Sequence, residues 1–475
     1  MNTRKTLLLA LLLGASVLYL TKVFLPERER QQEQGKVFVG LQESQMTRID
    51  VISRALVGEV EQYSIVRNVT ATSDTSNPTK SSWTMPDIRG AVLDTKIIEQ
   101  FVKTLLELPV EDPLSERQLL ADLSVYGLDK PPLTIVVHKG TEDLVEVAFG
   151  KKNEYLSKRY AKVSGRPGVF LVPDGLFMTL NKGRSEVRSK NPVQFDVTDV
   201  REVLLTSSQG RIKLSQPAVG EWKIVEPRAL PASREAIESL LNSLRGVTVS
   251  EFVEAGSDEL GRYGFNTPRV NVHLHMREGL EPSQVVFSLA NAGAKSGGQE
   301  ELYLQVSGVD SIYKLAADPS PSLVKQLNDL RDREIVGLTA SMIENVVSSG
   351  AEVVPTTIAA SGLLWTVNGK ESDPVFVEQY LKDLAGLKAD GFPEGVPADA
   401  FEPPFLQLTV TTKGEEKKTF ILTIGKQFVG AGSEQMRYVK GSNSETVFGI
   451  REVEAKRLVP HEEALSAKVT PTPKP

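Results

Sequence analysis

The chain of 475 residues contains no cysteine at all. This absence excludes a disulfide framework, thiolate metal sites and a lipid-modified cysteine. It is compatible with an extracytoplasmic compartment but does not by itself demonstrate export. Histidine is also scarce, with four residues, and aromatic residues make up only 6% of the chain.

Positive charge is not in excess either, because the formal net charge is −6 while 40% of the residues are hydrophobic. This balance argues against general nucleic-acid binding, which needs a basic surface. One dense basic stretch stands out, and it contains Lys151, Lys152, Lys158, Arg159 and Lys162. It is either the solvated edge of a sheet or a contact with an anionic surface, and we favour the first interpretation.

Motifs for catalysis or cofactor binding are missing from the sequence. No nucleophile elbow, phosphate-binding loop or dinucleotide fingerprint falls between a strand and a helix. His273 and His275 share one strand face and could bind a metal, but the matching strands carry at most His138 and no third ligand is recognisable. His461 is expected on the surface. We therefore assign no catalytic, cofactor-binding or metal-binding residue.

What the sequence does contain is an internal repeat marked by its tryptophans. Trp83, Trp222 and Trp365 stand at nearly equal intervals, and each follows a strand-like run and precedes a helical pattern. We expect them in domain cores and not on ligand-stacking surfaces.

Each tryptophan is followed by a good helix N-cap. These caps are Asp94, Ser233 and Asp373. Side-chain oxygens of these residue types accept hydrogen bonds from the first free N–H groups of a helix. Apolar residues at helical spacing follow each cap, and the large ones expected to mark the repeat cores are Phe101, Leu240 and Tyr380.

The resulting prediction is an α+β fold made of three tandem repeat domains. Each domain is expected to contain a mostly antiparallel sheet, one main helix and a short closing helix, because alternating apolar residues follow each main helix. Each copy is large enough to bury its own core. The predicted segments are a membrane anchor with a short cytoplasmic N-terminus at 1–25, a polar linker at 26–44, repeat domains at 45–192, 193–335 and 336–460, and a disordered tail at 461–475.

The N-terminus carries an apolar run, and this run is either a membrane anchor or a signal peptide. A spanning helix needs roughly 20 residues, which Thr6–Leu25 supplies if Lys22 extends toward the interface. A weak cleavage site at Gly14-Ala15-Ser16 keeps secretion after cleavage as the second possibility, but the apolar run continues past it. The residues that mark the expected anchor are Thr6, Leu7, Leu13, Leu20 and Leu25.

Charges next to the run predict its orientation. Arg4 and Lys5 precede it and favour the cytoplasmic side, so the large C-terminal region is expected in the periplasm of a bacterium. The prediction is a single-pass protein of the inner, or cytoplasmic, membrane.

The aligned copies resemble the DUF4340 family, a family of domains of unknown function. The resemblance lies in the segment from Glu221 to Pro227 around the second tryptophan, the capped helix Ser233–Leu244, and the Tyr-Gly pair Tyr263-Gly264 before Pro268. The first copy matches through Trp83, Pro86 and Tyr126-Gly127-Leu128. The third copy lacks the tryptophan-proximal proline and the Tyr-Gly pair.

This resemblance implies a bacterial envelope protein with one N-terminal helix, of a kind found beside ABC-type export systems, including a gliding-motility auxiliary protein. It transfers no catalytic residue. The first hypothesis is therefore a non-enzymatic, membrane-anchored accessory or scaffold protein without a cofactor, whose partners are envelope proteins such as an ABC permease.

Two other hypotheses stay open. One is an envelope hydrolase with a carboxylate or histidine site between domains, which predicts a pocket with converging titratable groups. The other is a structural spacer or a ligand-sensing ectodomain. The oligomeric state does not follow from the sequence.

Overall fold

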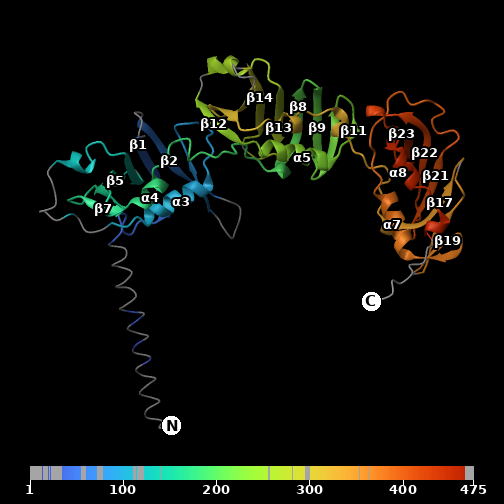
Figure 1. The fold of residues 1–475 in the computed structure, drawn as a ribbon, viewed down its shortest axis with the longest axis horizontal. Coiled ribbons are helices and arrows are strands. Elements are labelled where there is room, and N and C mark those ends of the chain that lie inside the picture. The colour runs from blue at the N-terminus through green and yellow to red at the C-terminus, as the bar shows by residue number, and fades with distance from the viewer. Residues whose placement is uncertain are drawn as a thin grey trace, which may run out of the picture. The chain divides into compact units, whose positions relative to one another are not determined.

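The computed structural model describes residues 35–465 except 55–59, 72–78, 111–113, 115–121, 141, 255–256, 281, 295–299, 352 and 363. Of the preceding residues it describes Leu13, Ser16, Leu20 and Lys22. The described part of the chain belongs to the α+β class and forms three antiparallel sheets of seven, nine and eight strands (Figure 1).

The strands occupy the sequence in three consecutive groups. The first sheet contains β1 (Arg48–Arg54), β2 (Val60–Ala71), β3 (Thr79–Thr84), β4 (Leu133–Lys139), β5 (Glu142–Asn153), β6 (Lys158–Val163) and β7 (Phe170–Pro173). The second contains β8 (Val200–Ser207), β9 (Gly210–Ala218), β10 (Glu221–Glu226), β11 (Leu230–Pro231), β12 (Val249–Glu254), β13 (Val270–Met276), β14 (Gln284–Ala294), β15 (Glu300–Val306) and β16 (Ser311–Leu315). The third contains β17 (Ile343–Ser349), β18 (Thr357–Ser361), β19 (Leu364–Val367), β20 (Lys370–Ser372), β21 (Leu406–Thr412), β22 (Thr419–Val429), β23 (Gln435–Gly441) and β24 (Phe448–Arg451).

The three sheets share one strand order. The first reads β3-β2-β1-β4-β5-β6-β7, the second contains β10-β9-β8-β13-β14-β15-β16, and the third contains β19-β18-β17-β21-β22-β23-β24. The second sheet adds β11 at one edge and β12 at the other, and the third adds β20. The repetition indicated by the tryptophans is thus also a repetition of topology.

The helices fall at matching places in this order. In chain order, the main helix of each copy lies between the third and the fourth of the strands that the copies share. The closing helices follow the last strand of each sheet. The helices are α3 (Thr95–Leu106), α4 (Asp174–Leu180), α5 (Arg234–Arg245), α6 (Ser320–Leu323), α7 (Pro374–Ala385), α8 (Glu452–Arg457) and α9 (Glu462–Leu465).

The predicted caps begin all three main helices. Asp94 accepts a hydrogen bond from the Ile97 N–H, Ser233 from Ala236 and Asp373 from Val375. Each bond satisfies a backbone donor that has no partner inside the helix.

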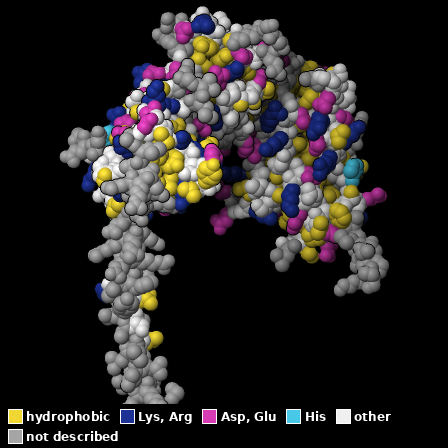
Figure 2. All heavy atoms as spheres, turned by 60° about the vertical axis from the view of Figure 1, so that its left-hand side comes forward, with side chains coloured by type: hydrophobic (Ala, Val, Ile, Leu, Met, Phe, Trp, Pro, Cys, Tyr) yellow, Lys and Arg dark blue, Asp and Glu magenta, His cyan; other side chains and the backbone are white. Residues whose placement is uncertain are grey.

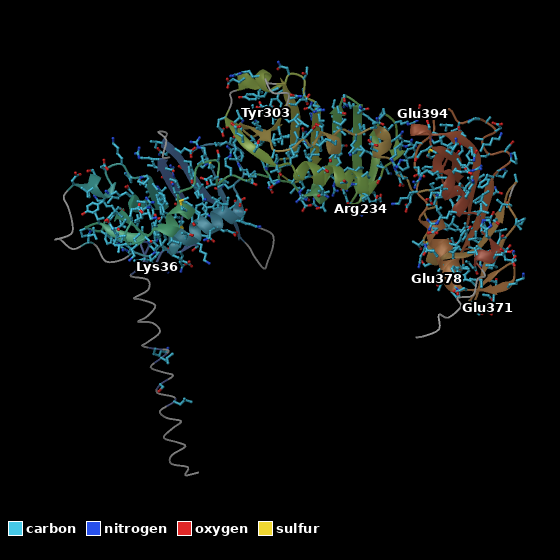
Figure 3. The ribbon with its side chains drawn as sticks, viewed as in Figure 1. Lys36, Arg234, Tyr303, Glu371, Glu378 and Glu394 are labelled. Atoms are coloured by element: carbon cyan, nitrogen blue, oxygen red, sulfur yellow. The ribbon has the colours of Figure 1, made fainter. Side chains whose placement is uncertain are left out.

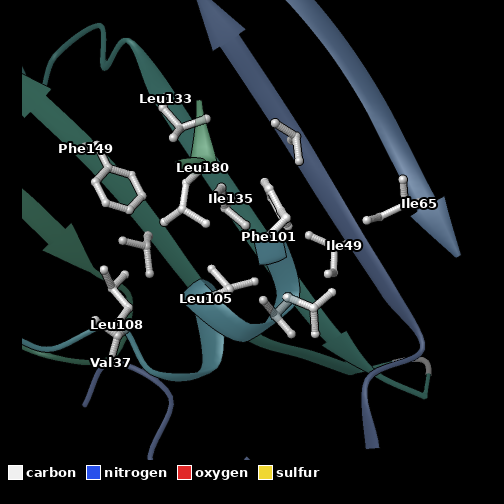
Figure 4. Close-up of a cluster of buried hydrophobic side chains, with 14 of the residues drawn as sticks. Val37, Ile49, Ile65, Phe101, Leu105, Leu108, Leu133, Ile135, Phe149 and Leu180 are labelled. Carbon is white, nitrogen blue, oxygen red and sulfur yellow. The ribbon is translucent and has the colours of Figure 1, made fainter. Parts of the chain in front are cut away.

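The core of the first sheet lies between the sheet and its two helices (Figure 4). Phe101 and Leu105 of α3 pack with Leu180 of α4 against strand residues such as Ile135 and Phe149. Each of these side chains is buried, and burying one such apolar side chain stabilises the fold by about 1.5–3 kcal/mol. The third sheet has its own core, to which α7 contributes Val377, Leu381 and Leu384.

The chain forms two compact units, and their boundaries do not coincide with those of the three sheets. One unit comprises residues 1–211 and 240–324, and the other comprises 212–239 and 325–475. The second sheet contributes strands to both units. The domain boundaries stated from the sequence therefore remain predictions.

Two segments at the ends of the described region differ from their predictions. The predicted linker at 26–44 includes Val37 and Phe38, which are buried in the first core because both are apolar and the Val37 N–H bonds the carbonyl of Leu108. The predicted disordered tail begins with α9, where Leu465 is buried and Glu462 binds Lys370. Disorder is thus the wrong prediction for 461–465, and 466–475 lie outside the described residues.

The predicted membrane anchor falls mostly outside the described part of the chain. Leu13 and Leu20 are described and exposed, whereas Thr6, Leu7 and Leu25 lie outside the described residues. Among the described residues, no helix combines the length and the apolar character that crossing a membrane requires.

Candidate functional site at the joints between sheets

The three tryptophans occupy the same strand of each sheet. Trp83 lies on β3, Trp222 on β10 and Trp365 on β19, and each of these is the third strand of its sheet in chain order. Trp222 and Trp365 are buried, and Trp83 is half-buried against the first core. Their surroundings are those of packing residues.

The markers on the main helices face the cores as well. Phe101 and Leu240 are buried, and the buried Tyr380 donates its hydroxyl hydrogen to the carbonyl of Leu458. The Trp222 ring N–H is buried and has no hydrogen-bond partner among the described residues, which carries a desolvation cost.

A polar cluster on β1, β2 and β4 contains one of the four histidines. The Asp50 carboxylate lies 2.6 Å from the Ser64 hydroxyl and 2.7 Å from Nε2 of His138, and Arg48 binds the same carboxylate. Burial alone would raise the pKa of Asp50, but hydrogen bonds from Ser64, Arg48 and His138 outweigh burial and hold it below its usual value. The aspartate stands between the serine and the histidine, and each of them is bound to a different oxygen of its carboxylate.

The two histidines of the second sheet lie on the half-exposed face of β13. His273 and His275 alternate along the strand with the buried Val272 and Leu274, as their spacing predicts. Within the described residues, no group of three histidine or acidic side chains is close enough to hold a metal ion. His461 is exposed.

A short segment between the first and second sheets is hydrogen-bonded on both sides, and we call it the first joint (residues 187–190). The Asp94 N–H donates a hydrogen bond to the Val187 carbonyl, and the Ser189 N–H donates one to the carbonyl of Val92. Its far end accepts a hydrogen bond from Val249 on β12. The segment is therefore hydrogen-bonded on one side to residues before α3 and on the other to the second sheet.

Arg188 fixes this joint. Its side chain is 1% exposed, and its guanidinium bonds Glu254 at 2.6 Å and the Ser311 hydroxyl at 2.7 Å. The guanidinium carbon also lies 4.0 Å from the centre of the Phe252 ring. A planar cation can bind carboxylate and aromatic face together, which an ammonium does less well.

The second joint (residues 330–333) is built in the same way. The Ser233 N–H bonds the Leu330 carbonyl, the Asp332 N–H bonds that of Pro231, and the Ala389 N–H bonds that of Arg333. All these residues belong to the second unit.

Arg331 takes the place of Arg188 in the second joint. Leu93 forms an isolated antiparallel β-bridge with Arg188, and Ala232 forms the same kind of bridge with Arg331. The Arg331 guanidinium lies 3.5 Å from the centre of the Phe392 ring and donates to Asn328. Burial lowers the pKa of Arg331, as does the nearby Arg228, yet an arginine stays charged in proteins.

The acidic partner differs between the joints. Val249 and Ala389 are the residues whose N–H groups bind the first and the second joint. A phenylalanine follows each of them after three residues and a glutamate after five, so Glu394 corresponds to Glu254. Glu254 binds the arginine of the first joint, whereas Glu394 is exposed at one end of the third sheet (Figure 3). No ion pair of Glu394 is found among the described residues.

A cleft of about 620 Å³ opens at Glu394. Its apolar lining includes Phe392, Phe428 and Met436, and Phe428 stacks on Tyr438 with ring centres 4.4 Å apart. Its charged lining consists of Asp329, Arg333, Asp390, Glu394 and Glu434. Arg451 already pairs with Asp390, and Asp329 accepts from the Gln326 N–H. A lining that combines apolar side chains with mostly acidic ones suits a ligand that carries both apolar surface and positive charge.

The domain boundaries predicted after residues 192 and 335 lie near these segments, but the joints themselves were not predicted. The available signal was an arginine at each junction and a phenylalanine shortly after α5 and shortly after α7. Neither has a local period, and only the fold brings them together.

A family model described as "Domain of unknown function (DUF4340)" matches residues 83–220 and 222–404. The first match begins at Trp83 and the second at Trp222, the tryptophans on equivalent strands. No curated protein and no solved structure matches the chain. Because the matched segments cover more than half of its residues, the chain belongs to the DUF4340 family.

Proposed function

We propose that this chain is a non-catalytic, membrane-tethered accessory protein of the bacterial envelope, which presents binding surfaces on repeat domains to a protein complex. The observation that carries the proposal is the repeated joint with its buried, ring-stacked arginine. A joint hydrogen-bonded on both sides resists bending, so it suits a protein that keeps binding surfaces at fixed spacing. A structural spacer would use the same property.

The cleft at the second joint distinguishes a binding protein from a bare spacer. A spacer needs closed joints, and the first joint is closed by Glu254. The second leaves Glu394 and an aromatic lining accessible. The cleft is therefore our proposed contact surface, and the resemblance-based candidate partner is an ABC permease. A tether would raise the local concentration of both proteins.

Surface charge is consistent with a protein-binding role. On the face shown in Figure 2, acidic and basic side chains alternate over the described residues without a large region of one sign. Such a surface does not attract polyanions along its length.

The test of partner binding is site-specific photocrosslinking in intact cells. A photoreactive residue replaces Glu394 in the cleft or, as the matched control, the exposed Glu378 at the other end of the third sheet (Figure 3). We expect a transporter subunit to be crosslinked from position 394 and not from 378. Recovery of the chain alone from both positions would contradict the proposal.

Membrane topology is tested separately, and the missing cysteine makes this simple. Val453 is 73% exposed and lies outside the cleft, so a Val453→Cys variant carries one accessible thiol. If the C-terminal region is periplasmic and tethered, a membrane-impermeant maleimide will label it in spheroplasts, and the labelled chain will stay with the membrane pellet. Labelling only after lysis would contradict the predicted orientation, and release into the supernatant would indicate cleavage.

A further inference from the structure

The hairpin tip between β5 and β6 exposes apolar side chains to solvent. This tip (residues 154–157) carries Tyr155, which is 97% exposed, and Leu156, which is 51% exposed. A fully exposed tyrosine beside an exposed leucine loses the stabilisation that burial of either would give. Such a pair at a protruding turn is typical of a contact surface.

The backbone of the tip is held in place, so the two side chains are presented by a formed turn. The Tyr155 N–H bonds the side-chain oxygen of Asn153, and the Asp174 N–H bonds the carbonyl of Ser157. The second bond attaches the tip to the start of α4. Because the turn is already ordered, binding through Tyr155 and Leu156 costs little additional backbone entropy.

Basic residues flank this tip on both sides in the sequence. Residues 151–162 contain five basic side chains and a single acidic one, Glu154. The neighbouring Asp174 is occupied by Arg159 at 2.9 Å and lies 3.5 Å from Lys152. Lys151 is exposed, and no ion pair of it is found in the described part of the chain. The tip therefore combines an exposed aromatic and an exposed aliphatic side chain with basic residues on the two strands that flank it.

The equivalent hairpins of the other two sheets lack this combination. Between β14 and β15, residues 295–299 read Lys-Ser-Gly-Gly-Gln, and between β22 and β23, residues 430–434 read Gly-Ala-Gly-Ser-Glu. Only the copy closest in sequence to the predicted anchor has an aromatic tip. A shared structural need of the fold would not single out one copy.

We propose that this tip docks on an anionic phospholipid bilayer, with Tyr155 and Leu156 at the headgroup level and the lysines facing lipid phosphates. Tyrosine favours the membrane interface, and basic side chains are attracted to its negative surface. This inference rests on the proposed membrane tether. The nine residues 26–34 between the predicted span and the described region reach about 30 Å when extended, which leaves the tip free to contact the surface.

The experiment uses the full chain reconstituted in nanodiscs, with a polarity-sensitive fluorophore on a single introduced cysteine. The probe is placed by Leu156→Cys, which keeps Tyr155, or by Val429→Cys at the equivalent hairpin of the third sheet. The nanodiscs contain phosphatidylcholine with or without phosphatidylglycerol, and a nitroxide lipid serves as quencher.

We expect blue-shifted, quenched emission at position 156 in discs with phosphatidylglycerol, and weaker quenching in phosphatidylcholine alone or at high salt. The double change Tyr155→Ser and Lys151→Glu should reduce quenching at 156 to the level at 429. Since both side chains are exposed, this variant should fold normally, which its unfolding midpoint checks.

Two failures remain distinguishable. If the chain does not enter the nanodiscs, the tether of the proposed function fails. If the chain enters but the probes at 156 and 429 are quenched equally, the docking proposal is overturned while the tether stands.

Discussion

At the scale of single residues, the stability of this protein depends on a few buried groups that hold distant segments together. Trp222 packs where β10 leads toward the main helix, and it lies almost entirely inside the protein. Asp50 gathers hydrogen bonds from three strands. Both are positions where one substitution removes several contacts.

Replacing Trp222 by alanine should destabilise its fold by about 3–5 kcal/mol, because the change leaves a large cavity. The same change at the half-buried Trp83 should cost less. Urea unfolding of the two variants gives the comparison. Unchanged stability of Trp222→Ala together with lost partner binding would instead indicate a stacking surface.

The second residue-scale prediction concerns acid. The folded-state pKa of Asp50 lies below its usual value of 3.8. The ionised carboxylate therefore stabilises the fold above that value, and this contribution is lost as pH falls through the folded-state pKa. Asp50→Asn should lower the urea midpoint at pH 7, and the difference from wild type should shrink below pH about 4.

The control for this prediction is Asp310→Asn, which removes an exposed ion pair with Arg89. Its effect should be small at every pH, since exposed pairs contribute little. A constant difference between Asp50→Asn and wild type from pH 7 to pH 3 would show that the carboxylate charge is not what matters.

At the scale of elements, helix starts and closing helices follow one plan in each copy. The main helices begin at a side-chain cap. In the first and third sheets an arginine binds the first residue of the closing helix, since Arg159 pairs with Asp174 and Arg437 with Glu452. The negative side chain also lies at the positive end of the helix. The helices α4 and α8 are thus fixed to their sheets by charge as well as by packing.

Removing a cap should have a modest, local effect. Asp373→Ala should lower the free energy of unfolding by about 1 kcal/mol, because the Val375 N–H loses its acceptor. Glu378→Ala, at an exposed position of the same helix, should change it by less than about 0.5 kcal/mol. Thermal unfolding followed by circular dichroism measures both, and equal effects would mean that the cap bond contributes nothing specific.

At the scale of the whole molecule, the joints determine how well one sheet is fixed to the next. In the first joint, backbone hydrogen bonds join the segment to both neighbours, and Arg188 reaches across to β12 and β16. The contacts come from three separate stretches of chain. Removing the hydrogen bonds of the Arg188 guanidinium should therefore make the joint more mobile without unfolding the sheet on either side.

This can be measured with spin labels in the cysteine-free chain. Lys103→Cys on α3 and Glu278→Cys after β13 are both exposed and lie on the two sides of the first joint. We expect a narrow distance distribution that broadens on Arg188→Met, which keeps much of the side-chain volume but loses the charge and the fork. Arg262→Met, at a 73% exposed position, is the control. A distribution that is already broad in wild type would contradict a fixed joint.

The sequence by itself determined the elements and their repetition. Caps such as Asp94 and apolar residues such as Ile98 and Leu105 act within one or two helical turns, so they can be read from neighbouring positions. Strand alternation in β13 follows from local periodicity in the same way. The family membership also rests on these local segments.

Only the tertiary structure decided how the copies are joined and where a cleft opens. Arg188 meets Glu254 and Ser311, and Arg331 meets Phe392, across long stretches of sequence. Contacts of this kind depend on three-dimensional packing and leave no period in the chain. Glu394 occupies the same place in the repeat as Glu254, but it lines a cleft, and the sequence does not show this difference either. The difference between a closed joint and an open one is set by which side chains the fold brings within reach.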